Sequence, residues 1–186
     1  MRTLVRRARG FTLIELMVVV ALVSVILTLV MPSFTGLLAR KRLEGVASEL
    51  GTDLQYARSE AVQRNARVRV IFGSACYAIH VVGTTDATNC TTLGTGAVAL
   101  KTLQLTTGAA ATLAFTPATA GVLFVEFDPV RGMAVDSTGA VDMSGYVNVS
   151  SSAGTWQLRA IVTRYGRMKT CSPNASVTGF SNDCST

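Results

Sequence analysis

One carboxylate, Glu15, stands within an apolar stretch of the sequence and is the first candidate for chemistry. Between residues 11 and 31 the other polar side chains are Thr12, Ser24 and Thr28. An acid at the centre of a bilayer costs about 2.5–3.5 kcal/mol on insertion scales. The chemistry expected of Glu15 is therefore the pairing of its charge with a partner outside its own helix.

The element that positions Glu15 is a predicted helix over residues 11–31. At about 1.5 Å per residue such a helix spans roughly 30 Å, the thickness of the hydrocarbon core of a bilayer. A secretory signal peptide is the alternative, but the apolar run exceeds the roughly 7–15 residues of a signal-peptide core, and no Ala-x-Ala site closes it. The arginines of the first ten residues place the N-terminus in the cytoplasm by the positive-inside rule. The sequence predicts one membrane span.

Residues 9–19, Arg-Gly-Phe-Thr-Leu-Ile-Glu-Leu-Met-Val-Val, resemble the class III signal of type IV pilins and pseudopilins. The resemblance implies that a prepilin peptidase cuts between Gly10 and Phe11 and that Phe11 is then N-methylated. Glu15 corresponds to the acid that pairs with the new α-amino group of a neighbouring subunit, and each of these charges offsets the desolvation of the other. Pro32 removes a helical hydrogen bond at the place where pilin helices have a proline, so a helix kink is expected there.

The sequence divides into three expected parts. Residues 1–10 are a leader that is cleaved, residues 11–66 are a transmembrane and amphipathic helix, and residues 67–186 are a β-rich periplasmic or extracellular domain. In the second half of the helix, apolar side chains recur every three or four residues, at Leu43, Val46, Ala47, Leu50, Leu54, Ala57 and Ala61. From residue 67 onward the period is two, with strand candidates at residues 67–72, 77–82, 98–105, 113–115, 122–127 and 156–162. The pattern predicts an α+β fold: a long N-terminal α-helix, transmembrane in its first half, packed on an antiparallel β-sheet domain, as in type IV pilins.

Three shorter motifs point to one branch of this family. They are residues 57–65 (Ala-Arg-Ser-Glu-Ala-Val-Gln-Arg-Asn), residues 127–132 (Phe-Asp-Pro-Val-Arg-Gly) and Gly166-Arg167. All three resemble segments of FimT, FimU and GspH proteins. We therefore expect a minor pilin or pseudopilin of that branch.

Four cysteines occur as two local pairs, Cys76 with Cys90 and Cys171 with Cys184, and four cysteines allow three connectivities. A translocated domain lies in an oxidising compartment, which favours disulfides. Zinc is the alternative, but the spacings lack Cys-x-x-Cys and the chain has one histidine. We expect nearest pairing, which closes two loops worth roughly 3 kcal/mol each on the chain-entropy model. Closure of the C-terminus in this way is associated with pilins more than with GspH.

Catalytic residues are not expected. His80, the only imidazole, lies in an apolar strand pattern, where a structural role is more frequent than general-base catalysis. The sequence has no Gly-x-Ser-x-Gly motif and no phosphate-binding glycine loop. We expect no enzymatic activity, no cofactor and no metal site.

Positive charge gathers near the end of the chain. The whole sequence has 17 basic and 11 acidic residues, and the leader arginines supply most of the excess. Near the end, Arg159, Arg164, Arg167 and Lys169 follow one another without an intervening acid. Residues 166–169, Gly-Arg-Met-Lys, resemble the Gly-Arg-x-Arg element of DNA-binding FimT proteins, but the final lysine lacks the bidentate fork and implies weaker phosphate binding. A solvated hairpin edge is the alternative interpretation.

Three functions fit the sequence. The first is a minor pilin that joins other minor pilins and the major pilin through its N-terminal helix and primes or caps a type IV pilus. The second is a pilus-displayed protein that binds double-stranded DNA weakly and without sequence preference, for natural transformation. The third is a GspH-like pseudopilin of a type II secretion system. In each, the chain is expected in the bacterial inner membrane, with its domain in the periplasm, before assembly into the pilus or pseudopilus.

Overall fold

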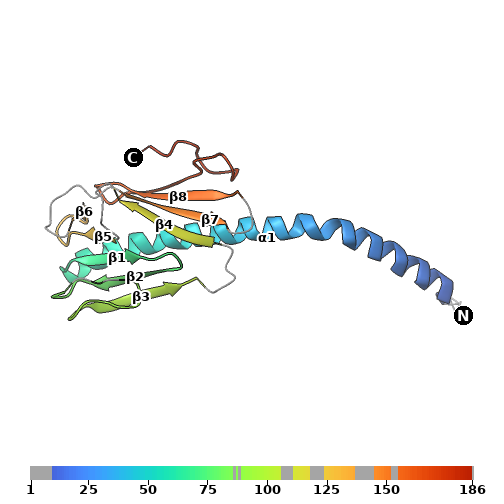
Figure 1. Ribbon diagram of the computed structural model, residues 1–186, viewed down its shortest axis with the longest axis horizontal. Coiled ribbons are helices and arrows are strands. Elements are labelled where there is room, and N and C mark those ends of the chain that lie inside the picture. The colour runs from blue at the N-terminus through green and yellow to red at the C-terminus, as the bar shows by residue number, and fades with distance from the viewer. Residues whose placement is uncertain are drawn as a thin grey trace, which may run out of the picture. The chain divides into compact units, whose positions relative to one another are not determined.

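The computed structural model describes residues 10–85, 87, 89–105, 111–117, 124–136, 145–151 and 155–185. The fold class is α+β, with one long helix and antiparallel strands, as predicted (Figure 1). The chain forms two compact units, Met1–Leu37 and Leu38–Thr186.

The helix α1 (Leu13–Arg64) begins directly after a capping threonine. The Thr12 Oγ1 atom accepts a hydrogen bond from the Glu15 amide at 3.3 Å. The two residues have the spacing of a capping box, in which a side-chain oxygen satisfies a free amide of the first turn. The capping residue Thr12 therefore specifies where α1 begins.

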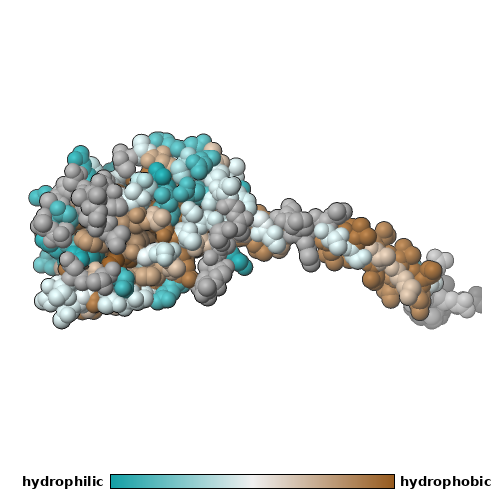
Figure 2. All heavy atoms as spheres, in the orientation of Figure 1, coloured by the Kyte–Doolittle hydropathy of each residue, from teal (hydrophilic) through white to brown (hydrophobic). Residues whose placement is uncertain are grey.

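The first unit exposes the apolar side chains of α1. The large apolar residues from Leu13 to Leu27 are exposed, and Figure 2 shows the apolar surface that they form. Among the described residues no helix is long and apolar enough to cross a membrane. The span expected over residues 11–31 extends into residues outside that description and stays a prediction. The side chains of residues 29–33 lie outside the described part, and the kink expected at Pro32 stays a prediction.

The strands form two antiparallel sheets. The period-two pattern of the sequence predicted strands but not their division into two sheets. The first sheet has the order β3-β2-β1-β5-β6 and the second the order β4-β7-β8-β9. The strands of the first are β1 (Val68–Phe72), β2 (Cys76–Val81), β3 (Val98–Gln104), β5 (Phe124–Phe127) and β6 (Ala134–Val135). Those of the second are β4 (Ala111–Pro117), β7 (Gly145–Ser151), β8 (Gln157–Val162) and β9 (Met168–Cys171).

The apolar stripe predicted on the second half of the helix faces the core. Its buried members are Leu43, Ala47, Leu50, Leu54, Ala57 and Ala61, and Val46 is half-buried. They belong to one apolar cluster with residues of both sheets, such as Val70 of β1 and Leu158 of β8. The helix therefore holds the two sheets in one core.

Polar contacts also join α1 to the first sheet. The buried Asp53 carboxylate accepts a hydrogen bond from the Tyr77 hydroxyl at 2.6 Å and lies 2.7 Å from the Lys101 ammonium. Lys101 also pairs with Glu49 at 3.1 Å. Burial, together with the bond to Asp53, raises the pKa of Tyr77, so its hydroxyl keeps the proton that it donates.

Both disulfides join cysteines that are nearest in sequence, so the predicted pairing is confirmed: Cys76–Cys90 and Cys171–Cys184. The two pairs of Cα atoms are 6.1 and 5.5 Å apart, within the usual range. The second disulfide closes the C-terminal loop. Within this loop, the Thr178 carbonyl and hydroxyl oxygens accept hydrogen bonds from Arg40 Nη2 at 2.9 and 2.6 Å. The loop is thereby tied to β9 and to α1.

Candidate functional site

The turn after β5 carries the motif Phe-Asp-Pro-Val-Arg-Gly and is closed by its aspartate. The Asp128 Oδ2 atom accepts hydrogen bonds from the amides of Val130, at 3.2 Å, and Arg131, at 2.9 Å. The Gly132 amide donates to the Asp128 carbonyl at 2.9 Å, and Gly132 has a φ of 62°, which glycine adopts without a steric penalty. The motif thus forms a tight turn with an exposed Arg131 side chain.

The turn between β8 and β9 is closed by Thr163. Its carbonyl accepts a hydrogen bond from the Gly166 amide at 2.8 Å, and its Oγ1 atom accepts one from the Arg167 amide at 3.2 Å. Gly166 has a φ of 70°. The Ala134 amide of β6 donates to the Arg164 carbonyl at 3.0 Å. A hairpin turn is therefore present here, and it lies against the first sheet.

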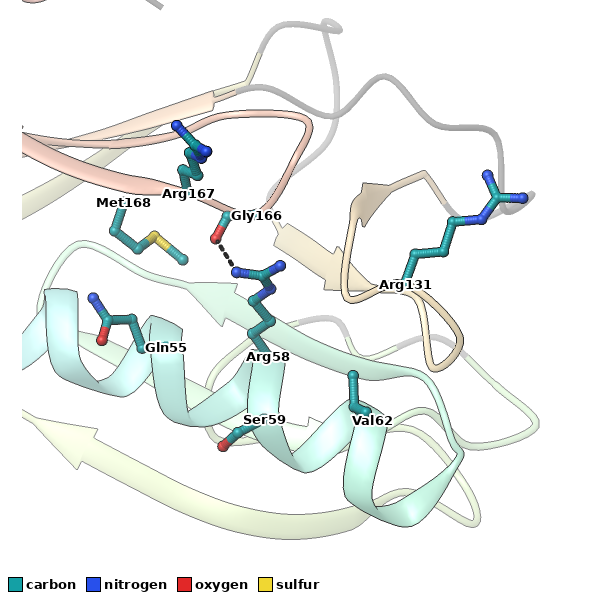
Figure 3. A pocket seen from close by; sticks show the side chains of 8 residues that line it. All are labelled: Gln55, Arg58, Ser59, Val62, Arg131, Gly166, Arg167 and Met168. Carbon is teal, nitrogen blue, oxygen red and sulfur yellow. Dashed lines mark hydrogen bonds between the residues drawn. The ribbon is translucent and has the colours of Figure 1, made fainter.

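Arg58 of α1 joins these two turns, and we call this contact the Arg58 clamp. Its Nε atom donates to the Gly132 carbonyl at 2.9 Å. Its Nη1 atom donates to the Gly166 carbonyl at 3.5 Å (Figure 3). A Cβ atom at position 166 would lie 2.4 Å from the Gly132 carbonyl oxygen, and one at position 132 would lie 2.9 Å from Arg58 Nε. Both turns therefore require glycine for close approach as well as for φ. The three short motifs seen in the sequence meet at this clamp.

An open groove lies beside the clamp and is lined by three arginines. Two hollows of about 590 and 860 Å³ share Arg58, Arg131 and Arg167. Arg58 rises from the helix, and Arg131 and Arg167 rise from the two turns on either side of it (Figure 3). Val62 and Met168 add apolar lining, and none of the described residues that line the hollows is acidic. We call this surface the arginine groove.

Two of the four basic residues that follow one another near the end of the chain are engaged elsewhere. The Arg159 guanidinium lies 3.9 Å from the ring centroid of Tyr146 and donates to the Asn148 side-chain oxygen at 2.9 Å. Lys169 pairs with Asp183 at 3.3 Å. These contacts place both groups away from the groove lining.

The other two, Arg164 and Arg167, lie at the β8–β9 turn and are exposed. Arg164 stacks on its neighbour Tyr165, 5.0 Å from the ring centroid, whereas Arg167 lines the arginine groove. Neither Arg58 nor Arg131 was expected from the sequence to be a site residue. The only available signal was their position inside the branch motifs, because nothing in the sequence shows that these motifs are adjacent in space.

The profile of the family described as type II transport protein GspH matches residues 46–166, more than half of the chain. This chain belongs to the GspH family. The match includes Arg58, the Asp128 turn with Arg131, and the β8–β9 turn up to Gly166, and the groove residues Arg167 and Met168 follow directly after it. A second profile, the prokaryotic N-terminal methylation motif, matches residues 5–31. The predicted resemblance to minor pilins and pseudopilins of the FimT, FimU and GspH kind is confirmed.

Two crystal structures of the type IV minor pilin FimU from Pseudomonas aeruginosa are similar to this GspH-family protein. One has a TM-score of 0.51 and 20% identity, and covers 70% of this chain and 88% of that chain. The other, in a second crystal form, has a TM-score of 0.51 and 18% identity, and covers 73% and 97%. At these identities the likeness shows the fold, a helix with antiparallel sheets. A comparison with curated proteins found no match.

In this GspH-family protein, the methylation motif contains the residues predicted for processing and charge pairing. Gly10 precedes α1, and the Phe11 side chain is 83% exposed. The Glu15 side chain is also exposed, and its carboxylate has no hydrogen-bond or ion-pair partner among the described residues. This charge is therefore available to a group from another molecule.

Three buried ionisable side chains lie side by side on neighbouring strands of the first sheet of the GspH-family domain. Arg69 and Glu126 are 2% and 0% exposed and are paired at 2.8 Å, and Arg69 lies over the Phe124 ring. His80, opposite Arg69 on β2, is 1% exposed, and its Nδ1 atom has no hydrogen-bond partner among the described residues. Burial, reinforced by the Arg69 charge, lowers the pKa of His80 to about 4. Burial raises the pKa of Glu126, and the neighbouring arginines oppose this shift.

Proposed function

We propose that this GspH-family chain is a minor pilin that joins other minor pilins and the major pilin through α1 and primes or caps a type IV pilus. The exposed, unpartnered Glu15 within the methylation motif supports this proposal. After a prepilin peptidase cuts between Gly10 and Phe11, the methylated α-amino group of a neighbouring subunit supplies the missing positive charge. Two opposite charges brought together in a low dielectric offset each other's desolvation, so assembly stabilises a charge that is unfavourable in the separate chain.

The proposed location before assembly is the inner membrane. Residues 1–10 form the cytoplasmic leader, residues 11–66 the membrane-anchored helix, and residues 67–186 the periplasmic domain. The basic leader ahead of the apolar stretch supports this orientation. The two disulfides support an oxidising location for the domain.

Glu15→Ala tests the assembly role. The variant is expected at normal or higher levels in the membrane, because a charge that is unfavourable in lipid is removed. Its amount in sheared pili is expected to fall by roughly tenfold or more, since the partner amine is left without a counter-charge. Immunoblots of the membrane and pilus fractions measure both. Glu15→Asp, which keeps the charge, is the matched control, and normal recovery of the alanine variant in pili would contradict the proposal.

Display of a DNA-binding surface is a second candidate function, supported by Arg164 and Arg167. Both are exposed, and neither has an acidic partner among the described residues. In a mobility-shift assay at low salt, the full chain in detergent would bind duplex DNA weakly and without sequence preference, with affinity falling steeply as salt rises. Replacing both arginines by alanine would abolish the complex, and Arg159→Ala would retain it. A titration without a complex would eliminate this candidate.

A GspH-like pseudopilin of a type II secretion system is the third candidate, supported by the description of the family profile. The closed C-terminal loop supports the pilus instead. Deleting the gene distinguishes the pilin from the pseudopilin. Loss of pili with normal secretion indicates a pilin, and loss of secretion with normal pili indicates a pseudopilin. The neighbouring genes provide the same distinction: other minor pilins in one case, a secretin and general secretion genes in the other.

A further inference from the structure

The charges of the arginine groove differ from most others on the globular unit. Among the described residues, seven basic side chains form salt bridges with carboxylates. Arg131 and Arg167 are exposed, and their guanidinium groups make no ion pair or hydrogen bond with a described residue. Arg58 donates only to two carbonyl oxygens, which carry no net charge. The groove therefore holds positive charge that no described residue neutralises.

Exposed apolar side chains surround these charges. Val62 and Tyr165 line the groove and are 49% and 54% exposed, and Val130, next to Arg131 in the chain, is 77% exposed. Covering such apolar surface with a partner is favourable, because it removes the surface from water. Arginine, tyrosine and methionine, all present here, are enriched in protein–protein interfaces. The composition of the groove is therefore that of a protein-binding surface.

We propose that the arginine groove docks an acidic segment of a neighbouring pilin subunit, in which carboxylates stand among apolar side chains. The inference rests on the proposed function, because the partner belongs to the same pilin assembly. A carboxylate accepts two parallel hydrogen bonds from the planar guanidinium of Arg131 or Arg167. Apolar residues of the same segment cover Val62, Tyr165 and Val130. A nucleic-acid backbone would use the charges but leave these apolar side chains uncovered.

The Arg58 clamp prepares the groove for such a partner. It holds the backbone beside Arg131 and the backbone beside Arg167 through one side chain, so the two guanidinium groups start from anchored turns. A preformed site loses less conformational entropy on binding than two independent loops would lose. Arg58 is therefore a positioning residue, and Arg131 and Arg167 are the binding residues.

Carbodiimide crosslinking in intact cells tests the chemistry of the partner. Arg131→Lys and Arg167→Lys, each in the full chain within its own assembly system, keep the positive charge and place a primary amine in the groove. A zero-length carbodiimide forms an amide between the lysine Nζ and a carboxyl carbon and takes up the displaced oxygen as a urea. Peptide mapping is expected to show this lysine joined to an Asp or Glu of another pilin subunit. Arg42→Lys, an exposed α1 cation outside the groove lining, is the matched control and should not join the same segment.

Charge reversal tests the strength of the contact. Arg131→Glu with Arg167→Glu is expected to lower co-purification of that subunit by at least about tenfold, because like charges then face each other. Both side chains lack intramolecular partners among the described residues, so the fold should be retained. Changing the crosslinked acid of the partner to lysine should restore binding.

The outcomes separate the two proposals. If no crosslink forms and charge reversal has no effect, while the wild-type chain still co-purifies with other pilins, the docking proposal is wrong and the proposed function stands. If the wild-type chain co-purifies with no pilin, both are wrong. If charge reversal abolishes a DNA complex and no crosslink forms, the groove binds nucleic acid and the docking proposal is overturned.

Discussion

At the scale of single residues, Arg58 joins two turns that are 74 and 108 residues away in the chain. Its guanidinium supplies charged donors to two backbone carbonyls that glycines leave accessible. Hydrogen bonds from charged groups contribute about 1.5–3 kcal/mol, more than neutral ones. The side chain is therefore expected to stabilise the fold as well as to shape the groove.

Arg58→Ala should lower the free energy of unfolding by about 1.5–3 kcal/mol, because both carbonyls lose their charged donor. Denaturant unfolding of the full chain in detergent, followed by the fluorescence of Trp156, measures this change. Arg131→Ala, on an exposed side chain of one of the clamped turns, is the control and should stay within about 0.5 kcal/mol of wild type. Equal losses in the two variants would show that the clamp does not contribute to stability.

His80 is expected to make stability depend on pH. Its pKa is lowered from 6.5 to about 4, so between these values the unfolded chain binds a proton that the folded chain excludes. Stability is therefore fully present above pH 6.5 and falls towards pH 4, by up to about 1.4 kcal/mol per pH unit. The raised pKa of Glu126 acts in the opposite direction, so wild type is compared with His80→Gln. The glutamine variant should lose stability less steeply, and an identical slope would refute the prediction.

At the scale of elements, the C-terminal loop depends on its disulfide. Cys171→Ser with Cys184→Ser should lower the free energy of unfolding by roughly 3 kcal/mol on the chain-entropy model. The loop between residues 172 and 183 should also become sensitive to limited proteolysis, which mass spectrometry detects. The matched control removes the other pair, Cys76 and Cys90, which is separated by a similar 14 residues. Cleavage of the C-terminal loop in both variants, or in neither, would contradict the prediction.

Elements with a clear period were predictable, and short or polar ones were not. The apolar stripe from Leu43 to Ala61 is buried as expected. Apolar residues spaced three or four apart lie on one face of a helix whatever element packs against that face. β6 and β9 have two and four residues, too few to display a period. β7 alternates buried and half-buried positions, but its glycine, asparagine and serines resemble a turn. Pairing with β4 and β8 on both sides overrides that local preference.

At the scale of the whole molecule, the two candidate sites differ in whether their residues are close together in the sequence. The methylation motif is contiguous over residues 5–31, so the sequence alone indicated it. The arginine groove combines α1 with two distant turns, and only the fold brings these together. Counting bases near the chain end grouped Arg159 with Arg167, although contacts with Tyr146 and Asn148 hold Arg159 elsewhere. The order of charges in the sequence therefore did not indicate which basic residues line the groove.

The polar contacts along α1 bear on how the globular unit would respond to a pulling force. Arg40, Asp53 and Arg58 each join the helix to a different part of the globular unit, and the first and last are about 27 Å apart along the axis at 1.5 Å per residue. In the filament proposed above, a pull along this helix would load these contacts in shear, and they would resist sliding together. Polar contacts thus hold the globular unit to its helix at three points along the axis, and in such a filament more than one of them would have to break before the unit could slide.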